Sequence, residues 1–116
     1  MKGSKAHVER AMALLLPLGP VQARAMFGDH GLYLDGVMFA LLGPDLHLKV
    51  DGETKPRFAA AGGVPFTYQR KGRQPVEMSY WKPPVGALSD AGTLLPWAEL
   101  AVAAARRAKA KKPRRR

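Results

Sequence analysis

The sequence predicts an α+β domain in which a mostly antiparallel sheet of about five to six strands packs against helices, in the order α-β-β-β-β-α-β-β-α. Three observations predict this fold. Runs typical of strands are joined by tight turns, which implies antiparallel neighbours. Segments with helical spacing of apolar residues flank and interrupt these strands. The length of 116 residues and a hydrophobic content of 47% suit one domain with a single core.

The first element is expected to be an amphipathic helix that Ser4 caps and that the breaker segment 17–20 ends. Its apolar stripe at helical spacing consists of Val8, Ala11, Met12, Leu15 and Leu16. A short strand is expected at residues 21–27, followed by a turn at residues 28–30.

The stretch GLYLDGVMFALL, residues 31–42, predicts a β-hairpin. Asp35 and Gly36 form a pair that tolerates the positive φ angles of a two-residue turn. The alternating sheet positions of this hairpin are expected to be Tyr33, Val37, Phe39 and Leu41. We therefore interpret the hairpin as scaffold.

A clean alternation follows the turn at residues 43–45 and predicts a strand over residues 46–50. Leu46, Leu48 and Val50 share one face, which we expect to be buried, and His47 and Lys49 share the wet face. Next comes a helix that Asp51 or Thr54 caps and that residues 62–63 end. Two further strands, at residues 65–70 and 76–81, are joined by the polar connection 71–75. Pro96 and Trp97 are then expected to open a long alanine-rich helix with Trp97, Leu100, Ala101 and Ala104 on one face.

Positive charge is concentrated at the C-terminal end. Of the 19 Lys and Arg, eight lie in residues 106–116, which contain no acidic residue, so the net charge of +10 divides into +8 for this segment and 10 − 8 = +2 for residues 1–105. We expect a domain over residues 1–105 and a disordered basic tail over 106–116. The tail would attract nucleic acid nonspecifically, or act only as a solubilising extension. Its basic residues are Arg106, Arg107, Lys109, Lys111, Lys112, Arg114, Arg115 and Arg116.

The second hairpin has two interpretations. Aromatic residues interleaved with basic ones are typical of surfaces that hold single strands. The alternation also places Phe66 and Tyr68 on one face with Met78 and Tyr80, where they would build the core against the helices, and this interpretation is favoured. Trp81 is the remaining aromatic residue of this hairpin. The tip then remains an exposed basic loop, and its candidate contacts with nucleic acid are Arg70, Lys71 and Arg73.

No chemistry of a catalytic or cofactor site is apparent. The chain has no cysteine, which excludes disulfides and thiolate ligands. Asp29, His30 and His47 lack the spacing of a metal site, and no serine lies in a nucleophile elbow. The glycines match no phosphate-binding loop. We therefore expect no enzyme, cofactor or metal. The apolar run at residues 11–18 is too short to span a bilayer, so we expect a cytoplasmic chain without membrane contact.

Several segments of the chain resemble, in the same order, the N-terminal domain of TfoX/Sxy, a bacterial competence-regulator family. The segments are RAMFGDHGLYLDGVMFALL, LHLKVD, PRFAAAG, PFTYQRKGR, MSYW and LLPWAELAVAAARR, and they cover roughly residues 21–107. The most distinctive positions are Met26, Phe27, Gly28, Gly31, Leu32, Tyr33, Gly36, Val37, Met38, Phe39 and Ala40. Asp29 departs from the pattern, because the family often has a second glycine there.

The resemblance implies a non-enzymatic regulatory or adaptor domain linked to transcription or competence, with no catalytic residue to transfer. Regulators of this family typically carry a second, helical domain, which this sequence lacks. The basic tail adds a nucleic acid as an expected partner. The alternative is a protein-protein interaction domain with no nucleic-acid role. The sequence does not choose between DNA and RNA, and it leaves the oligomeric state open.

Overall fold

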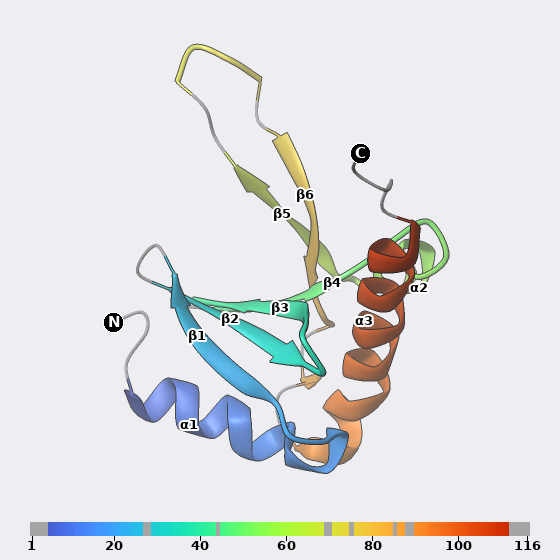
Figure 1. Ribbon diagram of the computed structural model, residues 1–116. Helices are drawn as coiled ribbons and strands as arrows, with labels where there is room; N and C mark the ends of the chain where they lie inside the picture. The colour runs from blue at the N-terminus through green and yellow to red at the C-terminus, as the bar shows by residue number, and fades with distance from the viewer. Residues whose placement is uncertain are drawn as a thin grey trace.

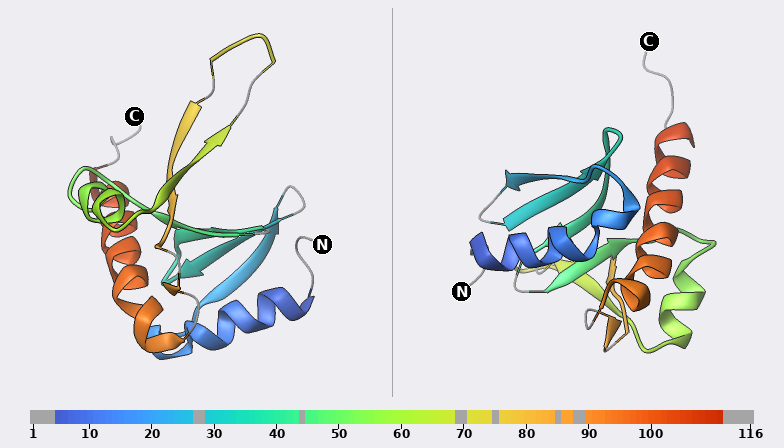
Figure 2. Two further views of the ribbon diagram at one scale, coloured as in Figure 1. Left: turned by 180° about the vertical axis from the view of Figure 1, so that it is seen from behind. Right: turned by 90° about the horizontal axis from the view of Figure 1, so that it is seen from below.

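A computed structural model shows a six-stranded antiparallel sheet with all helices on one of its faces (Figures 1 and 2). It describes residues 5–26, 29–43, 45–68, 71–74, 76–84, 86–87 and 90–111. The helical elements are α1 (Lys5–Leu14), the short 3-10 helix η1 (Leu16–Leu18), α2 (Lys55–Ala60) and α3 (Ala91–Lys111). The strands are β1 (Gln22–Met26), β2 (Asp29–Leu34), β3 (Val37–Leu42), β4 (Leu46–Lys49), β5 (Val64–Tyr68) and β6 (Val76–Lys82). The predicted fold class and element order are confirmed.

The strands lie side by side in the order β1-β2-β3-β4-β6-β5, so β1 and β5 form the two edges. Every neighbouring pair is antiparallel. Most neighbours in space are also consecutive in sequence, which is why tight turns in the sequence were sufficient to predict the pairing. Within the described part of the chain, no helix has the length and apolar character needed to cross a membrane.

The predicted hairpin between β2 and β3 is present. Asp35 has a φ of 54° and Gly36 a φ of 83°, and Leu34 pairs with Val37 directly across the turn. Both central residues therefore have the positive φ that a two-residue turn of this hand requires. The strand β2 begins earlier than expected, at Asp29, so the predicted turn at 28–30 is shorter, and residue 28 lies outside the described residues.

A β-bulge changes which side chains of this hairpin share a face. Leu32 pairs with Ala40, but Tyr33 pairs with Met38, so Phe39 is an extra residue on β3. As a result, Phe39 and Ala40 are both buried. The expectation that Phe39 and Leu41 share one face is therefore wrong. Leu41 pairs with His47 on the face away from the helices.

The core fills the space between the sheet and the helices. On β4 and just after it, Leu46, Leu48 and Val50 are buried, while His47 and Lys49 are half-buried on the other face, as the alternation predicts. Helix α3 packs against β3 and β4 through small side chains, which let the helix lie close to the sheet. The buried residues of α3 are Leu94, Ala98, Ala101, Val102, Ala104 and Ala105. Phe58 of α2 lies in the same cluster and contacts Trp97 of α3 edge-on.

Helix α1 is shorter than expected. It ends at Leu14, and the chain continues into η1, where Pro17 lies. Because the chain leaves the helical path there, Leu15 is fully buried but Leu16 is 72% exposed. Leu16 therefore does not belong to the buried stripe. The predicted cap residue, Ser4, lies outside the described residues.

Helix α3 starts earlier and ends later than expected. The backbone N–H of Thr93 donates to Oδ1 of Asp90 at 2.8 Å, so Asp90 caps a helix whose first residue is Ala91. Pro96 lies inside this helix, on its exposed side, rather than at its start. At the other end the helix continues to Lys111. The expectation of disorder from residue 106 is therefore wrong for residues 106–111, which are helical.

Candidate nucleic-acid interface

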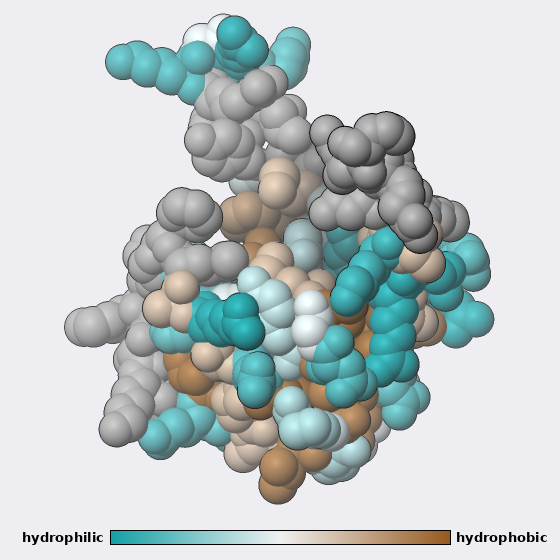
Figure 3. All heavy atoms as spheres, in the orientation of Figure 1, coloured by the Kyte–Doolittle hydropathy of each residue, from teal (hydrophilic) through white to brown (hydrophobic). Residues whose placement is uncertain are grey.

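The tip of the second hairpin carries the first group of predicted contacts. The β5–β6 hairpin projects from the body of the domain, and residues 71–74 lie at its far end (Figure 1). Lys71 and Arg73 are exposed there, and Gly72 between them has a φ of 71°. Figure 3 shows hydrophilic side chains at this far end. Arg70, the third predicted residue of the tip, lies outside the described residues.

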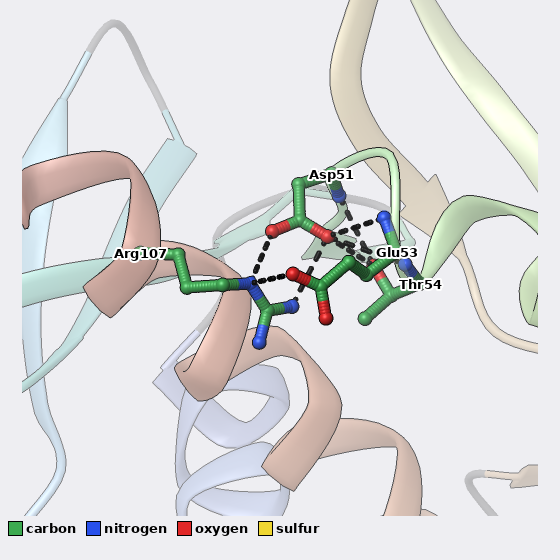
Figure 4. A network of polar contacts seen from close by, with 4 residues as sticks. All are labelled: Asp51, Glu53, Thr54 and Arg107. Atoms are coloured by element: carbon green, nitrogen blue, oxygen red, sulfur yellow. Dashed lines mark hydrogen bonds and ion pairs between the residues drawn. The ribbon is translucent and has the colours of Figure 1, made fainter. Parts of the chain in front are cut away.

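Two arginines of the predicted tail make ion pairs with the body of the domain. Nη2 of Arg106 donates to Oδ2 of Asp35 in the β2–β3 turn at 2.9 Å. Arg107 reaches the loop before α2, where its Nε donates to Oδ2 of Asp51 at 2.7 Å and its Nη2 donates to Oδ1 at 3.1 Å. The same Nε lies 3.4 Å from Oε2 of Glu53 (Figure 4). The sequence expectation that these arginines have no acidic partner is therefore wrong.

Asp51 is the centre of this network. Its Oδ1 accepts the backbone N–H groups of Glu53 at 3.0 Å and of Thr54 at 3.2 Å. In return, the backbone N–H of Asp51 donates to Oγ1 of Thr54 at 3.0 Å. This reciprocal arrangement is a cap for the turn that leads into α2, so both predicted cap residues take part in it. The hydrogen bond from Arg107, helped by these amides, lowers the pKa of Asp51 to about 2.

These contacts divide the predicted tail residues into two groups. Arg106 and Arg107 fasten the end of α3 to two loops, and their charges are compensated by carboxylates. Lys109 is exposed on the last turns of α3, and Lys111 is the last residue of the helix. The remaining residues of the list, Lys112, Arg114, Arg115 and Arg116, lie outside the described residues.

The aromatic residues of the second hairpin separate onto two faces. Trp81 pairs with Leu48 and belongs to the core, whereas Tyr80 pairs with Lys49 and faces away from the helices. Phe66 is half-buried on that second face, where its ring meets His47 edge-on with 5.0 Å between centroids. Met78 is exposed, and the side chain of Tyr68 lies outside the described part. The expectation that Phe66, Met78 and Tyr80 build the core against the helices is therefore wrong, and Trp81, on the opposite face, joins the core instead.

The face of the sheet away from the helices combines rings with cations. The guanidinium carbon of Arg24 lies 4.9 Å from the centroid of the Tyr33 ring, and Nζ of Lys49 lies 5.2 Å from the centroid of the Tyr80 ring. Strand register places these pairs on the same face as the pair of His47 and Phe66. We call this set of six residues the open sheet face. The alternation in β4 predicts a wet face for His47 and Lys49, but it contains no signal that connects them with Arg24 and Tyr33.

Tyr80 lies deep in the open sheet face. Burial, and to a lesser extent Tyr33, raises the pKa of Tyr80 to about 12. Tyr80 is only 9% exposed although no helix covers it, so neighbouring side chains of this face bury it. The steep angle between the β5–β6 hairpin and β1–β3 is visible in Figure 1.

Burial favours the uncharged form of His47. Desolvation lowers its pKa below the ordinary value of 6.5, and Asp45 opposes this shift only in part. The positive charge of the open sheet face at pH 7 therefore comes from Arg24 and Lys49.

No cluster of metal-ligating side chains is assembled in the part of the chain that the structure describes. It contains no group of three or more His, Asp or Glu that could hold an ion. Asp29 and His30 are neighbours on β2, so their side chains point to opposite faces, and His47 lies two strands away on β4. A groove beside α3 is lined by Arg57, Pro96, Trp97, Glu99 and Leu100.

The structure locates the family-motif positions that it describes. Gly36 forms the turn, Phe39 is in the core, and Tyr33 and Gly31 lie on the face away from the helices. Met26 ends β1, and residues 27 and 28 lie outside the described residues.

Fold and site together define a small α+β domain with a basic projecting hairpin and an open sheet face of rings and cations. The family model described as the TfoX N-terminal domain matches residues 13–105, so the chain belongs to the TfoX N-terminal domain family. The family is of a regulatory, non-catalytic type. A search of curated proteins found no match to the chain.

Proposed function

We propose that this chain is a non-enzymatic regulatory domain, linked to transcription or competence, that associates with nucleic acid without sequence specificity. The observation that carries the proposal is the exposed basic tip, Lys71 and Arg73, on a hairpin that projects from the domain. Family membership supports the regulatory part of the proposal. The net charge of +10 supports the attraction to a polyanion. The same proposal places the chain in the cytoplasm.

The ion pairs of α3 change which basic residues are expected to bind. Arg106 and Arg107 already have carboxylate partners, so a phosphate would have to displace Asp35 or Asp51. The cations past the helix end remain as candidates beside the hairpin tip, and they are Lys112, Arg114, Arg115 and Arg116.

The test is fluorescence anisotropy of labelled duplex DNA and single-stranded RNA over a series of salt concentrations. Two full-length variants are compared with the unchanged chain, namely Lys71→Gln with Arg73→Gln, and glutamine at the four cations past residue 111. A truncation at residue 105 would be misleading because it removes both ion-paired arginines. For duplex DNA, each lost phosphate contact should lower the log–log salt slope by about 0.9. Unchanged slopes in both variants would contradict the proposal.

A second candidate function is a protein-protein interaction domain without a nucleic-acid role. It is favoured by the exposed side chains of Val64 and Met78 and by the position of β5 at the sheet edge. A partner held in this way should bind the charge variants as well as the unchanged chain, and its affinity should depend weakly on salt. Such a result without any binding of DNA or RNA would favour this function over the first.

A further inference from the structure

The open sheet face is a surface that the helices leave uncovered. Helices α1, α2 and α3 contribute their buried residues to one cluster on the opposite side of the sheet. The views in Figures 1 and 2 agree that all three lie on that side. Gly31 pairs with both Arg24 and Leu41 on this face and is itself buried, so neighbouring side chains cover it. A ligand on this face would therefore meet the exposed parts of the rings and cations that line it.

The cations of this face lack carboxylate partners. Arg24 and Lys49 each lie against a tyrosine ring, and neither makes an ion pair with a described carboxylate. Lys82, at the end of β6, differs because its Nζ lies 3.7 Å from Oδ2 of Asp45. A ring holds a cation in place but does not neutralise it. Arg24 and Lys49 are therefore positioned cations whose charge is available to an anionic ligand.

The rings supply the second half of the recognition. Phe66 is half-buried, so it exposes part of its ring on this face, and the His47 ring lies edge-on beside it. The ring of Tyr33 holds Arg24. Tyr80 is too buried to stack on a ligand, and its role is to hold Lys49. Proteins that hold single strands regardless of sequence bind the phosphates with positioned cations and stack the bases on exposed aromatic rings.

We propose that the open sheet face binds single-stranded nucleic acid, with Arg24 and Lys49 contacting phosphates and Phe66 stacking on a base. This inference rests on the proposed function and names the surface and the class of ligand. A duplex fits less well because its bases are already stacked inside the helix and cannot reach the rings of this face.

The test uses the full chain and labelled oligodeoxythymidine of about twelve nucleotides, within the usual site size of such surfaces. The variant Arg24→Gln with Lys49→Gln should bind at least tenfold more weakly at low salt. Its log–log salt slope should fall by about 1.4, because each single-strand phosphate contact contributes about 0.7. The control is Lys55→Gln with Arg57→Gln on α2, which removes the same charge from the other side of the sheet and should leave the slope unchanged.

A second variant separates stacking from charge. Phe66→Leu keeps an apolar side chain but removes the ring, so affinity should fall about fivefold while the salt slope stays the same. Melting temperatures are measured for all variants. If the double variant does not fold, Arg24→Gln alone and Phe66→Leu carry the test, because Arg24 is an exposed residue near the edge of the sheet.

The outcomes distinguish this inference from the proposed function. One outcome is that the unchanged chain binds the oligonucleotide and that only the glutamine variants past residue 111 or at the hairpin tip reduce binding. In that case nucleic-acid binding stands and the assignment to the open sheet face is overturned. If Arg24→Gln with Lys49→Gln weakens duplex and single-strand binding equally, the assignment to single strands is overturned. If the unchanged chain binds neither DNA nor RNA, both proposals fail. Single-stranded RNA is measured in parallel, and its affinity relative to DNA identifies the preferred sugar.

Discussion

The contact between Arg107 and Asp51 gives the sharpest prediction about stability. Two hydrogen bonds, of 2.7 and 3.1 Å, join the end of α3 to the loop before α2. The pKa of Asp51 falls from its ordinary 3.8 to about 2, chiefly through this contact. At about 1.36 kcal/mol per pKa unit, the shift corresponds to at most about 2.5 kcal/mol. The two side chains are 30% and 22% exposed, and loop amides account for part of the shift, so we expect about 1 kcal/mol for the pair.

A double-mutant cycle measures this value. Arg107→Gln, Asp51→Asn and the double variant are unfolded by urea and by heat. The losses in unfolding free energy of the two single variants, added together, should exceed the loss in the double variant by about 1 kcal/mol. A loss of about 1 kcal/mol in unfolding free energy lowers the melting temperature of a domain of this length by roughly 4 °C. A coupling energy below about 0.3 kcal/mol would refute the reasoning. Arg106→Gln is the control, and its more exposed pair should contribute less than about 0.5 kcal/mol.

Three further predictions concern pH, the hairpin turn and the end of α1. The pKa of Asp51 is lower in the folded state than in the unfolded state, so the stabilisation by this carboxylate is complete above pH 3.8 and is lost as the pH falls toward about 2. The urea midpoint of Asp51→Asn should therefore change less over this pH range than that of the unchanged chain, and an equal change would contradict this prediction. Gly36→Val places a branched side chain at a φ of 83° and should cost roughly 1–2 kcal/mol without altering oligonucleotide binding; weaker binding at an unchanged melting temperature would show that the turn is more than scaffold. Leu15→Ala should cost roughly 2–5 kcal/mol, whereas Leu16→Ala should change stability by less than about 0.5 kcal/mol; similar losses in chemical denaturation would place both residues in the core.

Local rules were sufficient for much of the fold. The pair of Asp35 and Gly36 determines its turn by backbone conformation alone, and the alternation in β4 identifies Leu48 as buried and His47 as facing away. The start of α3 was missed because proline is typical of a first helical turn, but Asp90 offers the stronger cap upstream.

Contacts between distant residues account for most of the differences. Arg106 and Arg107 looked like part of an unpaired basic run, because their partners, Asp35 and Asp51, are 71 and 56 residues away in sequence. The bulge at Phe39 depends on how β2 and β3 pair, and period-two alternation contains no signal for it.

The open sheet face was hidden for a related reason. Arg24, Lys49 and Phe66 come from three strands that are separated in sequence, and only the strand order and register bring them onto one surface. The wet-face positions of β4 were the one available signal, since a half-buried histidine and lysine on alternating positions mark a face that is not core.

The most direct measurement of where nucleic acid binds is a titration of the isotope-labelled full chain with oligodeoxythymidine, monitored through its backbone amide resonances. We expect the largest shifts at Arg24, Lys49 and Phe66, with smaller changes at the hairpin tip and little change in the buried part of α3. Shifts confined to residues 106–116, with the amides of the sheet unchanged, would contradict binding at the open sheet face and assign the nucleic acid to the C-terminal basic residues.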